Sequence, residues 1–403
     1  MLDTLFDLAE ATVIDSDNPF LRFGDLLPVR DRGLYPLEAR ATPCVHAKRL
    51  GATVGLPRLY LKNETVNPTG STKDRSAIIS LGMLLESGTR HFTTSSTGNA
   101  GSAYAFALQR PQFAEMQMEL FVGSNFHERA HYGDADRVRV FSLRGGTFIE
   151  AGAVAAAYAR QMRLLTDGGF FSPGKREGAK LAFFEATDQI DQPIDWYVQA
   201  ISSGLGVEGT YKGAKELLAV KHIRRLPRLL CVQEDTCAPQ VRAWEEGSVV
   251  IEPHHVVHEP TGLALATHRG DPSRAYPYLR ANVIESRGTY TAVSEAEIRA
   301  ARVLVKHLEG IDICFSSSAA VAGLLKEARS KTVSPDETVV INLTGRDRAP
   351  ATKTERVTHL EYQDGTWVSE DGTLRIAEDS ALKRAFDRRR SGYPESGRTK
   401  SAT

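Results

Sequence analysis

The sequence predicts an α/β protein built from parallel β-sheets with helices on both faces. Between residues 59 and 343, short segments with the spacing of β-strands alternate with longer segments that have the spacing of helices. This alternation is typical of parallel sheets, because each strand needs a crossover helix to return to the same end of the sheet. The chain has 403 residues, which is enough for two or three domains and a large core.

The series of elements begins with a strand at residues 59–62, where larger apolar side chains recur at every second position. The apolar segment 77–85 then indicates a helix, and the helix at 295–308 has the acidic start that helix N-termini favour. The other strands are predicted at 92–95, 116–122, 137–143, 196–201, 229–233 and 339–343. The other helices are predicted at 100–110, 153–165, 177–190, 207–219 and 317–329.

Three segments lie outside this alternation. Residues 1–57 are predicted to form an N-terminal approach segment that packs on the main fold. Residues 356–380 are predicted to be a small β appendage, because strand-like pieces flank the turn signals Asp364-Gly365 and Asp371-Gly372. Residues 381–403 are rich in Arg, Lys, Ser and Gly, which predicts a basic disordered tail.

Composition excludes several classes of function. Apolar residues make up 41% and charged residues 25%, as in ordinary globular proteins, and the formal net charge is zero. We therefore expect no nucleic-acid partner and no membrane partner, and no stretch of about 18 apolar residues predicts a membrane span. The acidic N-terminus and the four irregularly spaced cysteines favour a cytoplasmic protein with reduced thiols. His254, His255, His258 and Glu259 lack a compact partner set, so no metal site is predicted.

The segment Asn67-Pro68-Thr69-Gly70-Ser71-Thr72-Lys73-Asp74-Arg75 carries the strongest chemical signal. Its Asn, Pro and Gly residues predict a turn between the first strand and its helix, so Lys73 lies at a helix start. Free backbone N–H groups make the local field positive there, and Arg75 adds a further charge. Such a field disfavours the ammonium form, and Lys73 becomes a candidate to form a Schiff base.

This segment resembles the cofactor-lysine motif of threonine synthases, in the fold-type II (tryptophan-synthase-β-like) family of enzymes that depend on pyridoxal 5′-phosphate (PLP). Thr72 is the one departure, because the family usually has phenylalanine there. A second departure lies upstream, where Thr42-Pro43 match the family but the usual Gly-Glu-Gly before them is absent. The resemblance covers roughly residues 20–350 and implies PLP as the cofactor, with Lys73 as the catalytic residue.

Three further strand ends resemble PLP-binding segments of the same family. Asn99, in a Ser-Thr-Gly-Asn loop, is implied to contact the phenolic oxygen of PLP, and Thr344, in Leu-Thr-Gly, to meet the pyridine nitrogen. A glycine-containing turn between a strand and a helix is implied to cradle the phosphate on backbone N–H groups. That turn consists of Ser202, Ser203, Gly204, Leu205 and Gly206.

The resemblance also implies where the substrate binds. Ser96 and Thr97 belong to the loop that holds the substrate carboxylate in the family, and their hydroxyls are candidates for the substrate phosphate as well. The family's phosphate-binding arginine falls on Lys175, which binds phosphate as a point charge without the bidentate fork of arginine. Arg176 is the candidate to replace that arginine.

The family architecture implies two domains, each an open and mostly parallel sheet flanked by helices. We expect residues 58–84 and 191–355 to form the large PLP-binding domain, and residues 85–190 a small mobile domain that closes over the substrate. A homodimer is expected from the same resemblance.

The implied reaction is elimination or replacement on an amino-acid substrate that carries a leaving group on its β or γ carbon. Threonine synthase chemistry, which converts O-phosphohomoserine and water to threonine and phosphate, is the first expectation. A specialised relative, a cysteine-synthase-like β-replacement enzyme acting on O-phosphoserine or O-acetylserine, a threonine or serine dehydratase, and a non-catalytic PLP-binding protein remain alternatives. All of the enzymes would use Lys73 in the same way, so residues farther from it decide between them.

Overall fold

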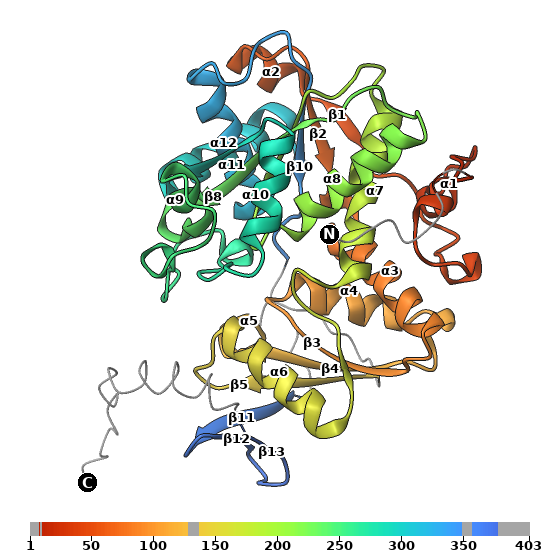
Figure 1. The fold of residues 1–403 in the computed structure, drawn as a ribbon, viewed down its shortest axis with the longest axis vertical. Coiled ribbons are helices and arrows are strands. Elements are labelled where there is room, and N and C mark those ends of the chain that lie inside the picture. The colour runs from red at the N-terminus through yellow and green to blue at the C-terminus, as the bar shows by residue number, and fades with distance from the viewer. Residues whose placement is uncertain (1–7, 9, 128–136, 349–356, 378–403) are drawn as a thin grey trace.

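The computed structural model of the chain describes residue 8 and residues 10–127, 137–348 and 357–377. Two mixed sheets, in which parallel pairs predominate, form two lobes with helices packed on their faces (Figure 1). The predicted α/β class is therefore present. No helix among the described residues is long and apolar enough to span a membrane. The predicted disordered tail, 381–403, lies outside the described residues.

The first sheet has six strands in the order β1-β2-β10-β7-β8-β9, and only the β1–β2 pair is antiparallel. Its strands are β1 (Cys44–His46), β2 (Leu59–Asn63), β7 (Trp196–Ala200), β8 (Arg228–Glu234), β9 (Thr289–Val293) and β10 (Val339–Leu343). The helices of this lobe are α2 (Lys48–Val54), α3 (Lys73–Glu86), α7 (Pro173–Gln189), α8 (Leu205–Ala219), α9 (Pro239–Glu245), α10 (Tyr276–Glu285), α11 (Glu295–Glu309) and α12 (Phe315–Arg329).

Successive residues of each strand face opposite layers of helices, as strand geometry requires. In β10, Val339 and Ile341 belong to the apolar cluster formed with α11 and α12, whereas Val340 belongs to the cluster formed with α7 and α8. Both faces of the sheet are therefore buried, which explains the nearly continuous apolar sequence of its central strands.

The second sheet has seven strands in the order β13-β12-β11-β5-β4-β3-β6. Its strands are β3 (His91–Ser95), β4 (Gln117–Gly123), β5 (Val138–Leu143), β6 (Leu165–Thr166), β11 (Val357–Gln363), β12 (Thr366–Ser369) and β13 (Arg375–Ala377). The remaining helices are α1 (Pro19–Arg22), α4 (Asn99–Leu108), α5 (Ser124–His127) and α6 (Phe148–Met162). Phe121, Phe141 and Tyr158 join α6 to one face of this sheet.

The strands after residue 356 extend this second sheet. β11 pairs in parallel with β5, and β12 and β13 continue the edge as antiparallel strands, the blue ribbons of Figure 1. Trp367 is fully buried against the cluster around α6. β11, β12 and β13 form a meander among the described residues, and its first strand makes it part of a larger sheet.

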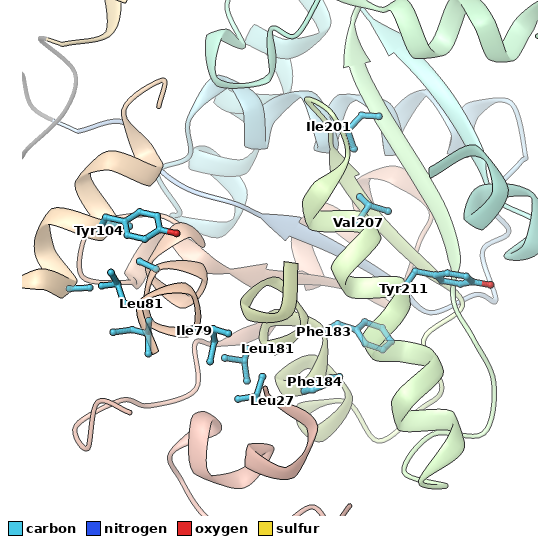
Figure 2. Packing of buried hydrophobic residues seen from close by; sticks show 14 of the residues in the cluster. Leu27, Ile79, Leu81, Tyr104, Leu181, Phe183, Phe184, Ile201, Val207 and Tyr211 are labelled. Atoms are coloured by element: carbon cyan, nitrogen blue, oxygen red, sulfur yellow. The ribbon is translucent and has the colours of Figure 1, made fainter. Parts of the chain in front are cut away.

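One apolar cluster extends from the first lobe into the second. Leu181, Phe183 and Phe184 of α7 cluster with side chains of α3 and α8, and the same cluster continues through Tyr104 to the second sheet (Figure 2). Helix α7, which the expected small domain 85–190 includes, packs against α3 and α8 of the first lobe. The domain boundaries stay a prediction. Sequence reasoning missed several elements, among them β1, α2, β9, α9 and α10, whose segments are short or flanked by irregular structure.

Candidate active site

A cavity of about 190 Å³ lies where the two lobes meet. It is lined by residues that follow the carboxyl ends of β2, β3, β7 and β10. Loops at this end of parallel strands are where α/β proteins bind ligands. Of the predicted site residues, all except Arg176 line the cavity: Lys73, Ser96, Thr97, Asn99, Lys175, Ser202, Ser203, Gly204, Leu205, Gly206 and Thr344.

Lys73 is the first residue of α3 and faces this cavity. Burial, together with the positive charge of Lys175, lowers the pKa of Lys73 to about 8. No hydrogen bond or ion pair to Nζ of Lys73 is present among the described residues. The site therefore holds an amine that is partly neutral at physiological pH and able to react with an aldehyde.

The predicted contribution of Arg75 to this pKa is wrong, because Arg75 is neutralised. Its Nε donates to Oε2 of Glu64 at 2.7 Å, and its Nη2 donates to Oε2 of Glu185 at 2.7 Å. Lys62 Nζ also donates to Oε2 of Glu185, at 2.6 Å. Thr42 completes this buried ion cluster by donating to Glu64 at 2.6 Å. Two cations and two carboxylates balance behind Lys73 and anchor the start of α3.

The turn after β7 has the geometry of an anion cradle. Gly204 caps α8 with a φ of +96°, a conformation that favours glycine, and an added Cβ would lie 2.2 Å from Leu279 Cδ2. A Cβ on Gly206 would lie 2.4 Å from Nε2 of Gln199. The first N–H groups of α8 have no partner within the helix, so this turn fits a phosphate group.

Thr344 lies directly beside the turn that carries Lys73. Its carbonyl accepts a hydrogen bond from the N–H of Thr72 at 2.9 Å, and its hydroxyl lies 3.5 Å from Oγ of Ser317. The end of β10 and the start of α3 are thus tied together. A neutral hydroxyl at this position fits a contact to a pyridine nitrogen.

Asn99 begins α4 and is held by an arginine that sequence reasoning missed. Nη2 of Arg348 donates to Oδ1 of Asn99 at 2.5 Å, while Nη1 of Arg348 donates to the carbonyl of Thr69 at 3.3 Å. Because arginine only donates, the oxygen of the Asn99 amide must face Arg348. The NH₂ group of Asn99 is then left to donate to a ligand oxygen.

The predicted substrate residues have different surroundings. Oγ of Ser96 accepts hydrogen bonds from the N–H groups of Gly98 and Gly101 at 3.0 and 2.9 Å, so this hydroxyl shapes its own loop. Nζ of Lys175 donates to the carbonyl of Asp167 at 2.9 Å. Arg176 is buried outside the cavity lining, and its Nε and Nη2 have no hydrogen-bond partner within the described part of the chain. The structure therefore does not bring Arg176 to the cavity.

His254 and His255, which the sequence offered as metal candidates together with His258 and Glu259, both lie against Glu246. Nε2 of His254 and Nε2 of His255 each lie 2.9 Å from Oε2 of Glu246, so three ligand atoms lie close together. Nδ1 of His255, however, accepts the N–H of Glu252 at 2.9 Å. The proton of this ring is therefore on Nε2, where it bonds Glu246. The arrangement is that of a carboxylate–histidine hydrogen-bond group.

The cavity that contains Lys73 is also lined by His268, a residue that the sequence analysis did not single out. Its Nε2 lies 2.8 Å from Oε2 of Glu234, the last residue of β8. These residues are far apart in the chain and belong to no local motif, so only the fold reveals the pair.

Comparison with known proteins agrees with this geometry. Residues 36–345 match the family described as "Pyridoxal-phosphate dependent enzyme". The chain is 30% identical over 351 residues to a threonine synthase of Methanosarcina acetivorans, covering 86% of this chain and 85% of that protein. It is 26% identical over 356 residues to a cysteate synthase of Methanospirillum hungatei, covering 83% and 81%.

Solved structures show the same fold. The processed form of threonine deaminase isoform 2 from Solanum lycopersicum superposes with a TM-score of 0.63 at 19% identity, covering 84% of this chain and 92% of that one. Serine racemase from Dictyostelium discoideum gives a TM-score of 0.60 at 20% identity, covering 77% and 93%. The fold-type II architecture and the resemblance to threonine synthases are confirmed.

The residues around the cavity fit PLP. A lysine amine with a lowered pKa, a glycine turn at a helix start, an amide donor and a neutral hydroxyl come from four separate strand ends to one cavity. This is the donor set that an aldehyde, a phosphate, a phenolic oxygen and a pyridine nitrogen require. The chain belongs to the pyridoxal-phosphate-dependent enzyme family.

Proposed function

We propose that this enzyme catalyses elimination or replacement on an amino acid with a phosphorylated side chain, in the manner of a threonine synthase. The observation that carries the proposal is the pair of lysines in one cavity: Lys73, whose amine has no partner among the described residues, and Lys175, whose ammonium is held by Asp167. A nucleophilic amine beside a fixed cation suits a substrate with an amino group at one end and a phosphate at the other.

The cofactor would be held by Lys73, by the turn 202–206, by the amide of Asn99 and by the hydroxyl of Thr344. When bound, PLP supplies an electron sink that makes the α proton of an amino acid acidic. A neutral partner such as Thr344 does not keep the pyridine nitrogen protonated, which favours elimination and replacement over transamination.

Lys73 has two tasks in the proposed reaction. Its amine would hold the cofactor, and Nζ, when it is free of the cofactor, would take the α proton of the substrate as a general base. A pKa of about 8 suits both tasks near neutral pH, because a base works best when its pKa is near the working pH. The Ser96–Thr97 loop would hold the substrate carboxylate.

Lys175 is the candidate for the substrate phosphate. Its ammonium is already held by Asp167 and by Oγ1 of Thr94, at 3.2 Å, so binding a phosphate needs little further ordering of the side chain. We do not propose Arg176 as a phosphate-binding residue, because it lies outside the cavity lining. The hydroxyls of Ser96 and Thr97 are further candidates.

A β-replacement reaction on O-phosphoserine is the second candidate, because the relatives include cysteate synthases. Cysteate is a sulfonate, so its enzyme also handles a small anion. O-acetylserine replacement, dehydratase activity and a non-catalytic PLP-binding role remain alternatives, and the homodimer and the cytoplasmic location remain predictions.

The test is a comparison of leaving groups. PLP-loaded enzyme is incubated separately with O-phosphohomoserine, O-phosphoserine and O-acetylserine, and released phosphate or acetate and the amino-acid products are measured. We expect threonine and phosphate from O-phosphohomoserine. Phosphate released from O-phosphoserine alone, with cysteate formed when sulfite is added, would shift the assignment to β-replacement. Release from neither phosphorylated substrate would overturn the proposal.

A further inference from the structure

The segment between α9 and α10 is folded around one buried carboxylate, Glu234 at the end of β8. Glu234 is 1% exposed, and its Oε1 accepts the N–H of Leu263 at 2.8 Å. Its Oε2 accepts the N–H of Ala264 and faces Nε2 of His268, each at 2.8 Å. Burial alone would raise the pKa of Glu234, but the hydrogen bonds from His268 and the two amides hold that pKa below its ordinary value.

The backbone is shaped to reach this carboxylate. Gly262 has a φ of +122°, which other residues rarely adopt, and a Cβ there would lie 2.5 Å from the carboxyl carbon of Glu234. The result of this close approach is a fixed position for His268, whose side chain is 6% exposed and which lines the cavity with Lys73 and Lys175.

Glu234 also fixes the tautomer of the ring. An ionised carboxylate only accepts, so Nε2 of His268 carries a proton. In the neutral ring the lone pair is then on Nδ1, for which no described residue provides a hydrogen-bond partner. A cavity-lining histidine with one nitrogen held by a carboxylate and the other without a partner among the described residues is the arrangement by which proteins orient a general base.

We propose that His268 is a second catalytic residue, the base that activates the incoming nucleophile, and that Glu234 is its positioning residue. This proposal rests on the function proposed above. As the nucleophile H–X adds, its H–X bond breaks, a C–X bond forms at an unsaturated carbon of the substrate, and the proton goes to Nδ1. The π electron pair of that carbon moves to the α carbon, which then takes a proton from Lys73. Glu234 stabilises the imidazolium until its proton returns to solvent.

In this assignment Lys73 and His268 act at different steps of the reaction. Lys73 serves the α carbon, whereas His268 serves only the addition step that follows departure of the leaving group. Loss of His268 should therefore leave elimination largely intact and slow the addition. The unsaturated substrate would then escape and hydrolyse to a 2-oxo acid and ammonia.

The experiment measures that partition. With the phosphorylated substrate that the wild-type enzyme turns over, released phosphate, replacement product and 2-oxo acid are quantified for wild type, His268→Asn and Glu234→Gln. We expect the ratio of replacement product to 2-oxo acid to fall by about 100-fold in His268→Asn, the usual size of a general-base contribution. Glu234→Gln should give the same direction, because a neutral amide no longer stabilises the imidazolium that forms when His268 takes the proton.

His254→Asn is the matched control, because His254 also bonds a glutamate but is exposed and outside the cavity lining. It should keep the wild-type ratio. A wild-type ratio in His268→Asn would overturn the assignment. If the wild type itself releases no phosphate from either substrate, the proposed function fails first.

A second measurement does not depend on turnover. Selective ¹⁵N labelling of histidine in the PLP-loaded enzyme should show the neutral His268 ring protonated at Nε2 in the wild type. It also tells a folded Glu234→Gln protein from an unfolded one. A wild-type ring protonated at Nδ1 alone would contradict the proposal.

Discussion

The starts of α3 and α7 face the same cavity, and each presents a lysine, yet the two lysines have opposite surroundings. Nζ of Lys73 has no hydrogen-bond partner among the described residues. Nζ of Lys175, in contrast, donates to the carbonyl of Asp167 and to the hydroxyl of Thr94. The charge of Lys175 in turn helps to lower the pKa of Lys73. Position at a helix start therefore does not decide whether a lysine reacts as a nucleophile or binds an anion. The hydrogen-bond partners of its ammonium group decide this.

Removing the amine of Lys73 is the strongest test of the difference between the two lysines. Lys73→Ala should lower turnover by on the order of 1,000-fold or more, because both the covalent attachment and the general base are lost. The purified variant should also lack the cofactor absorbance that borohydride abolishes in the wild type. Lys175→Ala is the matched variant and should keep that absorbance. Parental turnover in Lys73→Ala would refute the role of Lys73.

The two helices are also joined behind the cavity, where Glu185 of α7 bonds Arg75 of α3 and Lys62 of β2. Glu185→Gln should lower the free energy of unfolding by about 3–5 kcal/mol, because it leaves buried cations without their partner. Urea unfolding measures this change. Glu285→Gln, which breaks an exposed pair with Lys215, should cost about 1 kcal/mol or less. Equal effects in the two variants would show that the buried ion cluster does not anchor α3.

The sequence predicts which residues line the cavity better than it predicts the partners that surround them. Lys73, Gly204 and Thr344 are found because each lies in a local pattern at the end of a strand. The partner of Arg75 could not be found in this way, because Glu185 lies 110 positions away along the chain. The sequence placed Arg75 beside Lys73 as a free charge, and only the packing of α7 on α3 shows that this charge is neutralised.

Other parts of the site escaped prediction for the same physical reason. Arg348 reaches Asn99 across 249 positions, and His268 reaches Glu234 across 34, so neither pair leaves a periodic signal. Arg176 shows the converse error. It neighbours Lys175 in the sequence, but adjacent residues of a helix point about 100° apart, and Arg176 is buried away from the cavity.

The smallest expected effect is the one that tests the coupling between the two lysines. Lys175→Gln removes a positive charge near Lys73, so the ammonium form of Lys73 becomes less unfavourable and its pKa should rise above about 8. The rate at which the apoprotein captures PLP depends on the neutral amine, so the midpoint of its pH profile should move to higher pH. KM for the phosphorylated substrate should rise by about 10- to 100-fold, since a charged hydrogen bond is lost. Lys215→Gln, on the outer surface of α8, is the control and should change neither the midpoint nor KM. A midpoint that does not rise in Lys175→Gln would show that the charge of Lys175 does not lower the pKa of Lys73.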